Sequence, residues 1–316
     1  MNYKVCLFTC LSACVLMMVA ACDSPAREVT PKSGTKPGAS KPVETIFEPV
    51  VAGSFYPGDK TELLEMMDTF LAKAKPVKPK GHILGFVEPH AGYIYSGPVA
   101  AWGYKLLKGM KFDRVVIMGP SHRAYTDYIG VLNKDYYSIP TGKVKIDKKA
   151  CRTLLKDNSL FREDIRLFDR EHSVEVEMPF LQRVMPGVKV VPLVFGNPEP
   201  ETAKKAAQVL TRIFKGSNTL FIASSDLSHY HPYDHAVPED KATLKLIEAL
   251  DTTTLAAKWR TRERELCGFG PVMTLMYMAK MRKATAKIIH YANSGDTQGN
   301  KSRVVGYGVV AFSIIK

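Results

Sequence analysis

The sequence has few cysteines beyond its first residues. It contains six in total, and four of them lie within residues 1–22, namely Cys6, Cys10, Cys14 and Cys22. Residues 46–316 therefore keep only Cys151 and Cys267, which is too few for the disulfide framework of a small secreted scaffold. No internal repeat at a fixed period is present either, which excludes a solenoid or propeller.

Dense clusters of basic residues are also scarce, although the formal net charge is +13. The lysines are scattered, and the one dense cluster, Lys73, Lys75, Lys78 and Lys80, lies in a proline-containing connector. No nucleic-acid fold motif accompanies this cluster. We therefore expect a solvated basic face and no nucleic-acid partner.

The first 22 residues have the pattern of a secretory signal: an early lysine, an apolar run and small residues before Cys22. The ending Val-Ala-Ala-Cys resembles a bacterial lipobox, in which Cys22 would become the lipidated first residue. An ordinary cleaved signal and an uncleaved anchor are the alternatives. Residues 23–45 contain almost no large apolar side chain, so we expect a flexible tether. The expected location is the periplasmic side of the cell envelope, as a membrane-anchored lipoprotein.

Residues 46–316 alternate strand and helix patterns, as in a single α/β domain. The expected strands are residues 83–87, 114–118, 189–195, 219–223, 286–291 and 305–315. The expected helices are residues 62–73, 98–107, 148–156, 201–214, 239–249 and 272–282. This alternation predicts a mostly parallel or mixed sheet flanked by helices on both faces.

Several ionisable side chains follow the expected strands. His90 and His122 each come just after a strand, and Asp226 and His229 follow a third. Right-handed crossovers place the ends of parallel strands at one edge of the sheet, where ligands collect. We therefore expect these four side chains to share one crevice.

Cys267 comes just before an expected helix. Gly268 and Gly270 favour a tight turn, and Pro271 suits a first helical position. Backbone amides at a helix N-terminus favour a thiolate, which is the form that binds metal or attacks. The alternative is a small buried cysteine that closes the turn.

Seven motifs occur in one order along the domain: VAGSFYPGD, EPHAGYIYSG, MGPSH, EHSVEVEMPFLQ, SSDLSHY, CGFGP and YANSGDT. Together they resemble the Memo family, whose bacterial members are called AmmeMemoRadiSam system protein B. The resemblance implies a fold similar to class III extradiol dioxygenases of the LigB type. It also implies a metal site in which two histidines and a cysteine are the ligands, corresponding here to His90, His122 and Cys267.

The implied ligand set includes a thiolate where the dioxygenases use a carboxylate. A soft thiolate shifts the preference toward Cu(I), zinc or a thiolate-bound Fe(II). We expect one metal ion, iron or copper in the first place and zinc as the alternative.

Further residues have expected roles near this site. His229 is the candidate acid/base or an additional ligand, because imidazole titrates near neutrality. Asp226 would orient a histidine or bind metal directly. Glu171 and His172 would line the pocket, or serve as a helix cap or ion pair. Asp296 would bind substrate or close a turn.

Two classes of function fit these residues. The first is a metal-dependent enzyme with redox or dioxygenase-like chemistry on a small molecule. The second is a non-catalytic metal-binding or protein-interaction module on the same scaffold. Proteins of the AMMECR1 and radical SAM types, encoded with the family, are the partners implied by the resemblance. A serine hydrolase using Ser224 or Ser225 is disfavoured because no nucleophile-elbow pattern is present.

Overall fold

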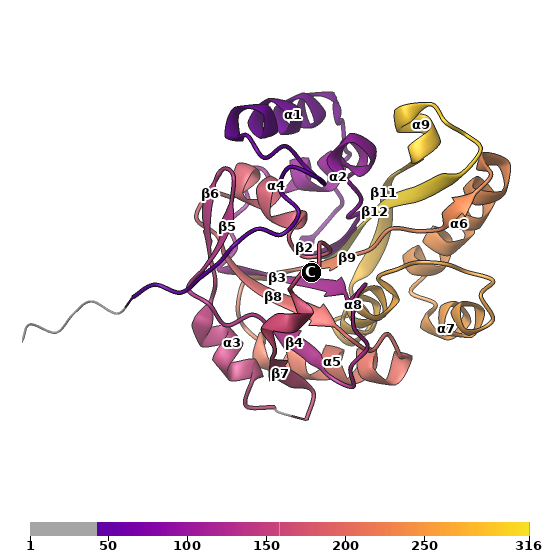
Figure 1. The fold of residues 1–316 in the computed structure, drawn as a ribbon. Helices are drawn as coiled ribbons and strands as arrows, with labels where there is room; N and C mark the ends of the chain where they lie inside the picture. The colour runs from indigo at the N-terminus through magenta and orange to yellow at the C-terminus, as the bar shows by residue number, and fades with distance from the viewer. Residues whose placement is uncertain (1–42, 158, 316) are drawn as a thin grey trace, which may run out of the picture. The chain divides into compact units, whose positions relative to one another are not determined.

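A mixed sheet forms the centre of the fold (Figure 1). The structure is a computed structural model, which describes residues 43–157 and 159–315. The strand order within these residues is β10-β12-β2-β9-β3-β8-β4-β7, with β11 also paired to β12. The strands are β2 (His82–Glu88), β3 (Arg114–Pro120), β4 (Ile129–Val131), β7 (Phe161–Glu163), β8 (Lys189–Phe195), β9 (Thr219–Ser224), β10 (His229–His231), β11 (Thr285–Asn293) and β12 (Val304–Ile314).

The four middle strands, β2, β9, β3 and β8, are all parallel to one another. They are almost wholly buried and rich in apolar residues, as expected for strands that are covered on both faces. Antiparallel strands lie on both sides of them, with β12 against β2 and β4 against β8. The predicted α/β class with a mixed sheet is confirmed.

Helices cover both faces of the sheet. In Figure 1, α1, α2 and α4 lie above the central strands, and α5 and α8 lie below them. Helix α8 packs on β9, β3 and β2, and α6 packs on β11 and β12. The helices are α1 (Lys60–Lys73), α2 (Tyr93–Leu107), α3 (Lys148–Leu154), the 3-10 turn η1 (Ile165–Leu167), α4 (Glu177–Val184), α5 (Pro200–Ile213), α6 (Tyr233–Glu248), α7 (Thr252–Arg260), α8 (Phe269–Met281) and α9 (Ser294–Gln298).

Local sequence explains where several helices begin. The Asp59 side chain accepts hydrogen bonds from the backbone of Thr61 and Glu62 and so caps α1. Pro200 opens α5 at a position where its missing N–H costs nothing. The expected helices over 62–73, 98–107, 201–214 and 272–282 are all present, some of them starting earlier than the pattern predicts.

The segment between β3 and β8 contains elements that were not predicted. Strands β4 and β7 have three residues each, and β5 (Tyr136–Ile139) and β6 (Gly142–Lys145) have four. Elements this short show no clear periodicity. Strands β5 and β6 join β1 (Ile46–Phe47) in a separate small sheet.

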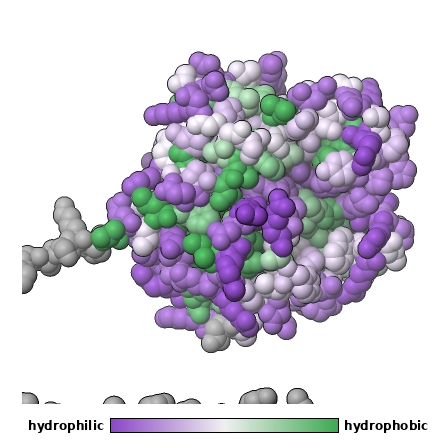
Figure 2. All heavy atoms as spheres, in the orientation of Figure 1, coloured by the Kyte–Doolittle hydropathy of each residue, from purple (hydrophilic) through white to green (hydrophobic). Residues whose placement is uncertain are grey.

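Residues Glu44–Lys316 form one compact unit. Figure 2 shows hydrophilic side chains over most of its visible face. None of the helices in the described ranges is both long and apolar enough to cross a bilayer. The predicted signal segment and nearly all of the predicted tether lie outside the described residues, so they remain predictions.

Candidate metal centre

Three adjacent parallel strands deliver ionisable side chains to one edge of the sheet. His90, His122 and Asp226 each lie two residues past the last residue of β2, β3 and β9. Strand β9 pairs with both of the others, so Asp226 lies between the two histidines in the strand order. This arrangement agrees with the crevice expected from the strand pattern.

The crevice is a pocket of about 570 Å³. This volume is in the range of small-molecule sites. The side chains around it are aromatic, imidazole and charged. They come from Phe55, His90, Tyr95, His122, His172, Asp226, His229, Tyr230, Arg303 and Tyr307.

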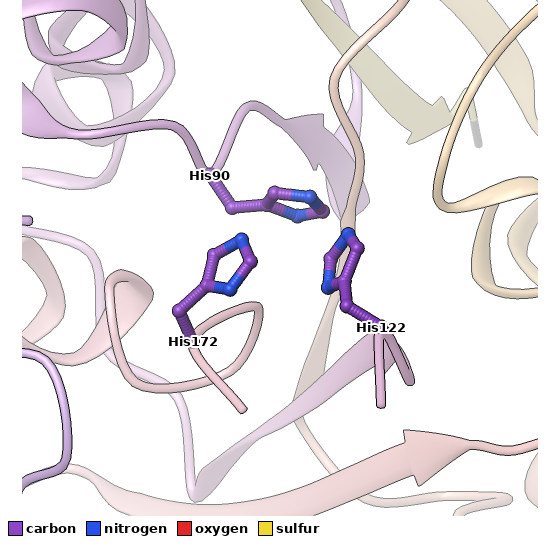
Figure 3. Close-up of side chains that lie close together, drawn as sticks. All are labelled: His90, His122 and His172. Atoms are coloured by element: carbon purple, nitrogen blue, oxygen red, sulfur yellow. The ribbon is translucent and has the colours of Figure 1, made fainter. Parts of the chain in front are cut away.

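Three imidazoles meet in this pocket (Figure 3). The rings of His122 and His172 are stacked with centroids 4.4 Å apart, and the His90 ring stands edge-on to both at 5.2 and 5.3 Å. One nitrogen from each ring lies within 4.8 Å of the other two. Donor atoms this close together are candidates for sharing one ion.

A second group of donors shares His90. His90, Asp226 and Cys267 also have ligand atoms within 4.8 Å of one another, and the Cys267 Sγ atom lies 3.0 Å from the His90 Nε2 atom. His122 and Cys267 do not belong to the same group. The structure thus brings each of these two predicted ligands close to His90, in two separate groups of donors.

Glu171 holds the His122 side chain. Its carboxylate lies 2.9 Å from His122 Nδ1 and also accepts the His122 backbone N–H. Burial raises the pKa of Glu171, but hydrogen bonds to His122 outweigh it and lower the pKa below its usual value. With Nδ1 occupied in this way, the Nε2 atom of His122 is left to face the pocket. The structure shows Glu171 as the partner of the His122 imidazole, and it is not among the residues that line the pocket.

The other two imidazoles are held in the neutral form. Burial, followed by the neighbouring His172, lowers the pKa of His90 well below its ordinary value. Burial and the neighbouring His122 lower the pKa of His172 to about 4. Neutral imidazole is the form that binds metal, so the pocket presents its ring nitrogens ready for coordination.

A buried chain of hydrogen bonds fixes the far side of His90. Its Nδ1 atom lies 2.7 Å from Ser224 Oγ, which lies 2.7 Å from a carboxylate oxygen of Glu177. The hydroxyl of Tyr104 donates to the other Glu177 oxygen. Burial raises the pKa of Glu177 to about 8. The His90 Nε2 atom is therefore the one that points to the donor groups.

Cys267 lies just before a helix, as the sequence predicts, but its surroundings do not favour the thiolate form that the sequence predicts. It lies just before Gly268, which caps α8. Burial raises the pKa of the thiol well above its usual value, and the Asp226 carboxylate raises it further. Backbone amides near the helix end act in the opposite direction but are outweighed. The protein alone does not favour the thiolate, so a bound cation would have to supply that stabilisation.

The remaining predicted residues divide between the pocket and the framework. His229 lines both the main pocket and a neighbouring one that also contains Cys267. Asp226 accepts the backbone N–H of His90, which fixes the loop after β2. Asp296 forms a capping box with Asn293 at α9, so it closes a turn. Ser224 and Ser225 are fully buried, which leaves neither free to act as a nucleophile.

Some pocket residues were missed by sequence reasoning or not given a firm role. His172 is one of the three clustered imidazoles, but it follows no strand and so lacked the signal that marked His90 and His122. Glu177 lies in the family motif EHSVEVEMPFLQ but was given no role; it supports His90 from behind the pocket. Tyr95 and Tyr230 lie within two of the family motifs but were given no role, and Arg303 lies outside all seven motifs.

These features define an α/β protein with a histidine-rich candidate metal site at the carboxyl edge of its sheet. A family model described as Memo-like protein matches residues 48–311, so the chain belongs to the Memo family. The resemblance noted in the sequence is thereby confirmed.

Curated relatives match over nearly their whole length. A MEMO1 family protein of Sulfurisphaera tokodaii is 35% identical over 278 residues, covering 84% of this chain and 98% of the relative. One from Ignicoccus hospitalis is 37% identical over 283 residues, covering 85% and 99%. Among solved structures, an uncharacterized protein from Escherichia coli K12 superposes with a TM-score of 0.48 at 12% identity, covering 72% of this chain and 99% of that chain.

Proposed function

We propose that this Memo-family protein is a metal-dependent enzyme that binds one metal ion beside His90. The observation that carries the proposal is the position of the His90 imidazole, which two groups of donor atoms share. Three pocket histidines and one thiol are more donors than a structural hydrogen-bond network needs. Iron or copper fits the mixed imidazole and thiolate donors first, and zinc is the alternative.

We take His90, His122 and Cys267 as the ligands, in agreement with the family resemblance. His172 competes with Cys267 for the third position, because its ligand nitrogen lies within 4.8 Å of those of His90 and His122. Carboxylate or hydroxyl partners hold Nδ1 of both His90 and His122, as is usual for metal-binding histidines. A bound ion would supply Lewis-acid or redox chemistry to a substrate in the pocket.

The other pocket residues provide for a small substrate. His229 lines the pocket within reach of solvent and is our candidate for proton transfer. Phe55, Tyr95 and Tyr230 provide aromatic surface, and the Arg303 guanidinium lies 5.2 Å from the centroid of the Tyr230 ring. These groups suit an aromatic substrate, and Arg303 adds a positive charge for an anionic substituent.

The test compares metal content and turnover in four variants of anaerobically purified protein. His90→Ala should lose the metal, and Cys267→Ala should lose it if the thiolate is the third ligand. If His172→Ala loses it instead, the ligands are three histidines. His229→Ala should keep the metal but lose on the order of 10² to 10⁴ in rate. Circular dichroism checks that each variant is folded.

Two outcomes would contradict this proposal, and a third would change the role of His229. Unchanged metal content in His90→Ala would remove the site itself. Full metal binding with no turnover of any aromatic or other oxidisable compound would favour the non-catalytic metal-binding module. Equal metal loss in His229→Ala would make His229 a ligand.

A further inference from the structure

A second group of possible metal ligands lies outside the pocket. His231 is the last residue of β10, and His235 and Glu239 lie in the first turns of α6. One ligand atom from each of the three lies within 4.8 Å of the others. His235 and Glu239 are four residues apart on one helix, so their side chains leave the same face. We propose that His231, His235 and Glu239 form a surface site for a divalent cation of the zinc type.

The distances suit a shared ion. Donor atoms about 2.1 Å from one ion lie roughly 3.4 Å apart in a tetrahedral arrangement. The Nδ1 atom of His235 lies 3.4 Å from a carboxylate oxygen of Glu239, and the rings of His231 and His235 have centroids 4.8 Å apart. This spacing is already close to that of a ligand set.

A further carboxylate comes from a separate segment. An oxygen of Glu265, in the loop between α7 and α8, lies 3.2 Å from His231 Nε2. It lies outside the group of three and is placed to orient the His231 ring. The two imidazoles are borderline donors that favour Zn²⁺ over the hard cations Ca²⁺ and Mg²⁺, and Zn²⁺ also accepts a carboxylate oxygen.

The site is open to solvent and its charges are mixed. The His235 side chain is 64% exposed, while Glu239 is 11% exposed. Arg262 and Arg264 line a pocket next to His235 and Glu239, so a cation held only by charge would be opposed there. Direct coordination by the histidine nitrogens would offset this electrostatic repulsion, which again favours a transition metal.

An ion at this surface site would also tie together two segments of the main pocket. His229 lies on the same strand as His231, and its backbone N–H lies 3.4 Å from the Glu265 carboxylate. Cys267 follows Glu265 by two residues. With Glu265 held by His231, both pocket residues would be more firmly positioned.

The test is Zn²⁺ binding to the full chain, measured by equilibrium dialysis with metal analysis. The double variant His231→Ala/His235→Ala should bind one equivalent fewer than the unmodified chain. Glu239→Gln, which keeps its size, should bind this equivalent at least about tenfold more weakly. His82→Ala is the matched control, because His82 is an exposed histidine at the opposite end of β2 from His90, and it should bind as the unmodified chain does.

Equal Zn²⁺ stoichiometry and affinity in the double variant and the unmodified chain would overturn this proposal. Binding at the surface site can be measured separately from binding in the pocket, because His90→Ala should still bind the Zn²⁺ equivalent held by the surface site. If His90→Ala binds less metal and the double variant does not, the result supports only the proposed function. If the double variant binds less metal and His90→Ala does not, the result supports only the surface site. Far-ultraviolet circular dichroism confirms that the variants compared are folded.

Discussion

The Nε2 atom of His90 lies 3.0 Å from the Sγ atom of Cys267, although 177 residues separate them in the chain. His90 follows β2, and Cys267 precedes α8, the helix that packs beneath the central strands. The contact therefore depends on the packing of α8 against the sheet. A neutral imidazole and a protonated thiol meet here, which is a pair that a metal ion would convert into two ligands.

Replacing Glu171 by glutamine should weaken metal binding without abolishing it. The substitution removes the negative charge beside His122 Nδ1 and one acceptor of the surrounding N–H groups. Loss of such a supporting group typically costs about 10- to 100-fold in affinity. Metal titration measures the effect, with Glu62→Gln, an exposed carboxylate in α1, as the control. Equal affinity in both variants would show that Glu171 does not support a ligand.

Glu177 should make the protein less stable as pH rises. Its pKa is raised to about 8 in the folded state, compared with 4.5 as the ordinary value. Between these values the folded state binds a proton that the unfolded state has released, so the free energy of unfolding falls by up to about 1.4 kcal/mol per pH unit. Below about pH 4.5 this contribution is fully present, and it is lost as pH rises through about 8.

Glu177→Gln should remove this part of the pH dependence. Denaturant unfolding at pH 5.5 and 7.5 gives the stability difference for each protein, and the variant should show the smaller fall. Other groups titrate in the same pH range. The quantity to compare is therefore the fall in the free energy of unfolding between the two pH values, in the variant and in the unmodified protein. The same fall in both would contradict a protonated Glu177.

Gly268→Ala should disturb the position of Cys267. An added Cβ would lie 2.2 Å from the Ser224 carbonyl oxygen and 2.5 Å from Ser225 Cβ, so the segment before α8 would have to move. We expect a loss of about 1–3 kcal/mol in the free energy of unfolding and weaker metal binding. Gly58→Ala is the control, since its nearest atoms are 3.5 Å away. A variant as stable as that control would refute the close contact.

The two cysteines of the described chain should react slowly and differently with iodoacetamide. Cys151 is fully buried and burial raises its pKa to about 12, whereas Cys267 is partly accessible. Peptide mapping by mass spectrometry should find Cys267 alkylated first, with a rate that still rises above pH 8 because its pKa is also raised. Bound metal should protect Cys267. Faster labelling of Cys151 in the native protein would contradict this order.

Lipidation of Cys22 is a prediction from the sequence alone. In the native host, Cys22→Ala should release the protein from the membrane fraction. Mass spectrometry of the unmodified chain should find a lipid-modified cysteine as the first residue. An unmodified N-terminus in a fully soluble protein would refute the lipoprotein hypothesis.

The long elements were predictable from local patterns. The central strands are apolar runs bounded by turn residues, and the helices between them repeat apolar residues at helical spacing, so both periodicities appear in the sequence. The ends of β2 and β3 also indicated His90 and His122. Short elements such as β4 and β7 were not predictable, because three residues contain no period and only their pairing makes them strands.

The sequence by itself determined that His90, His122 and Asp226 would meet at one edge of the sheet. Parallel strands run in the same direction, so the residues just after β2, β3 and β9 must lie at one edge of the sheet. Several of the family motifs contain these same residues. Only the tertiary structure decided which groups face one another. It stacked His172 on His122, brought two groups of donor atoms to His90 and enclosed enough of Cys267 to raise its pKa. Burial and contact depend on how α4 and α8 pack on the sheet, and no local pattern contains that information.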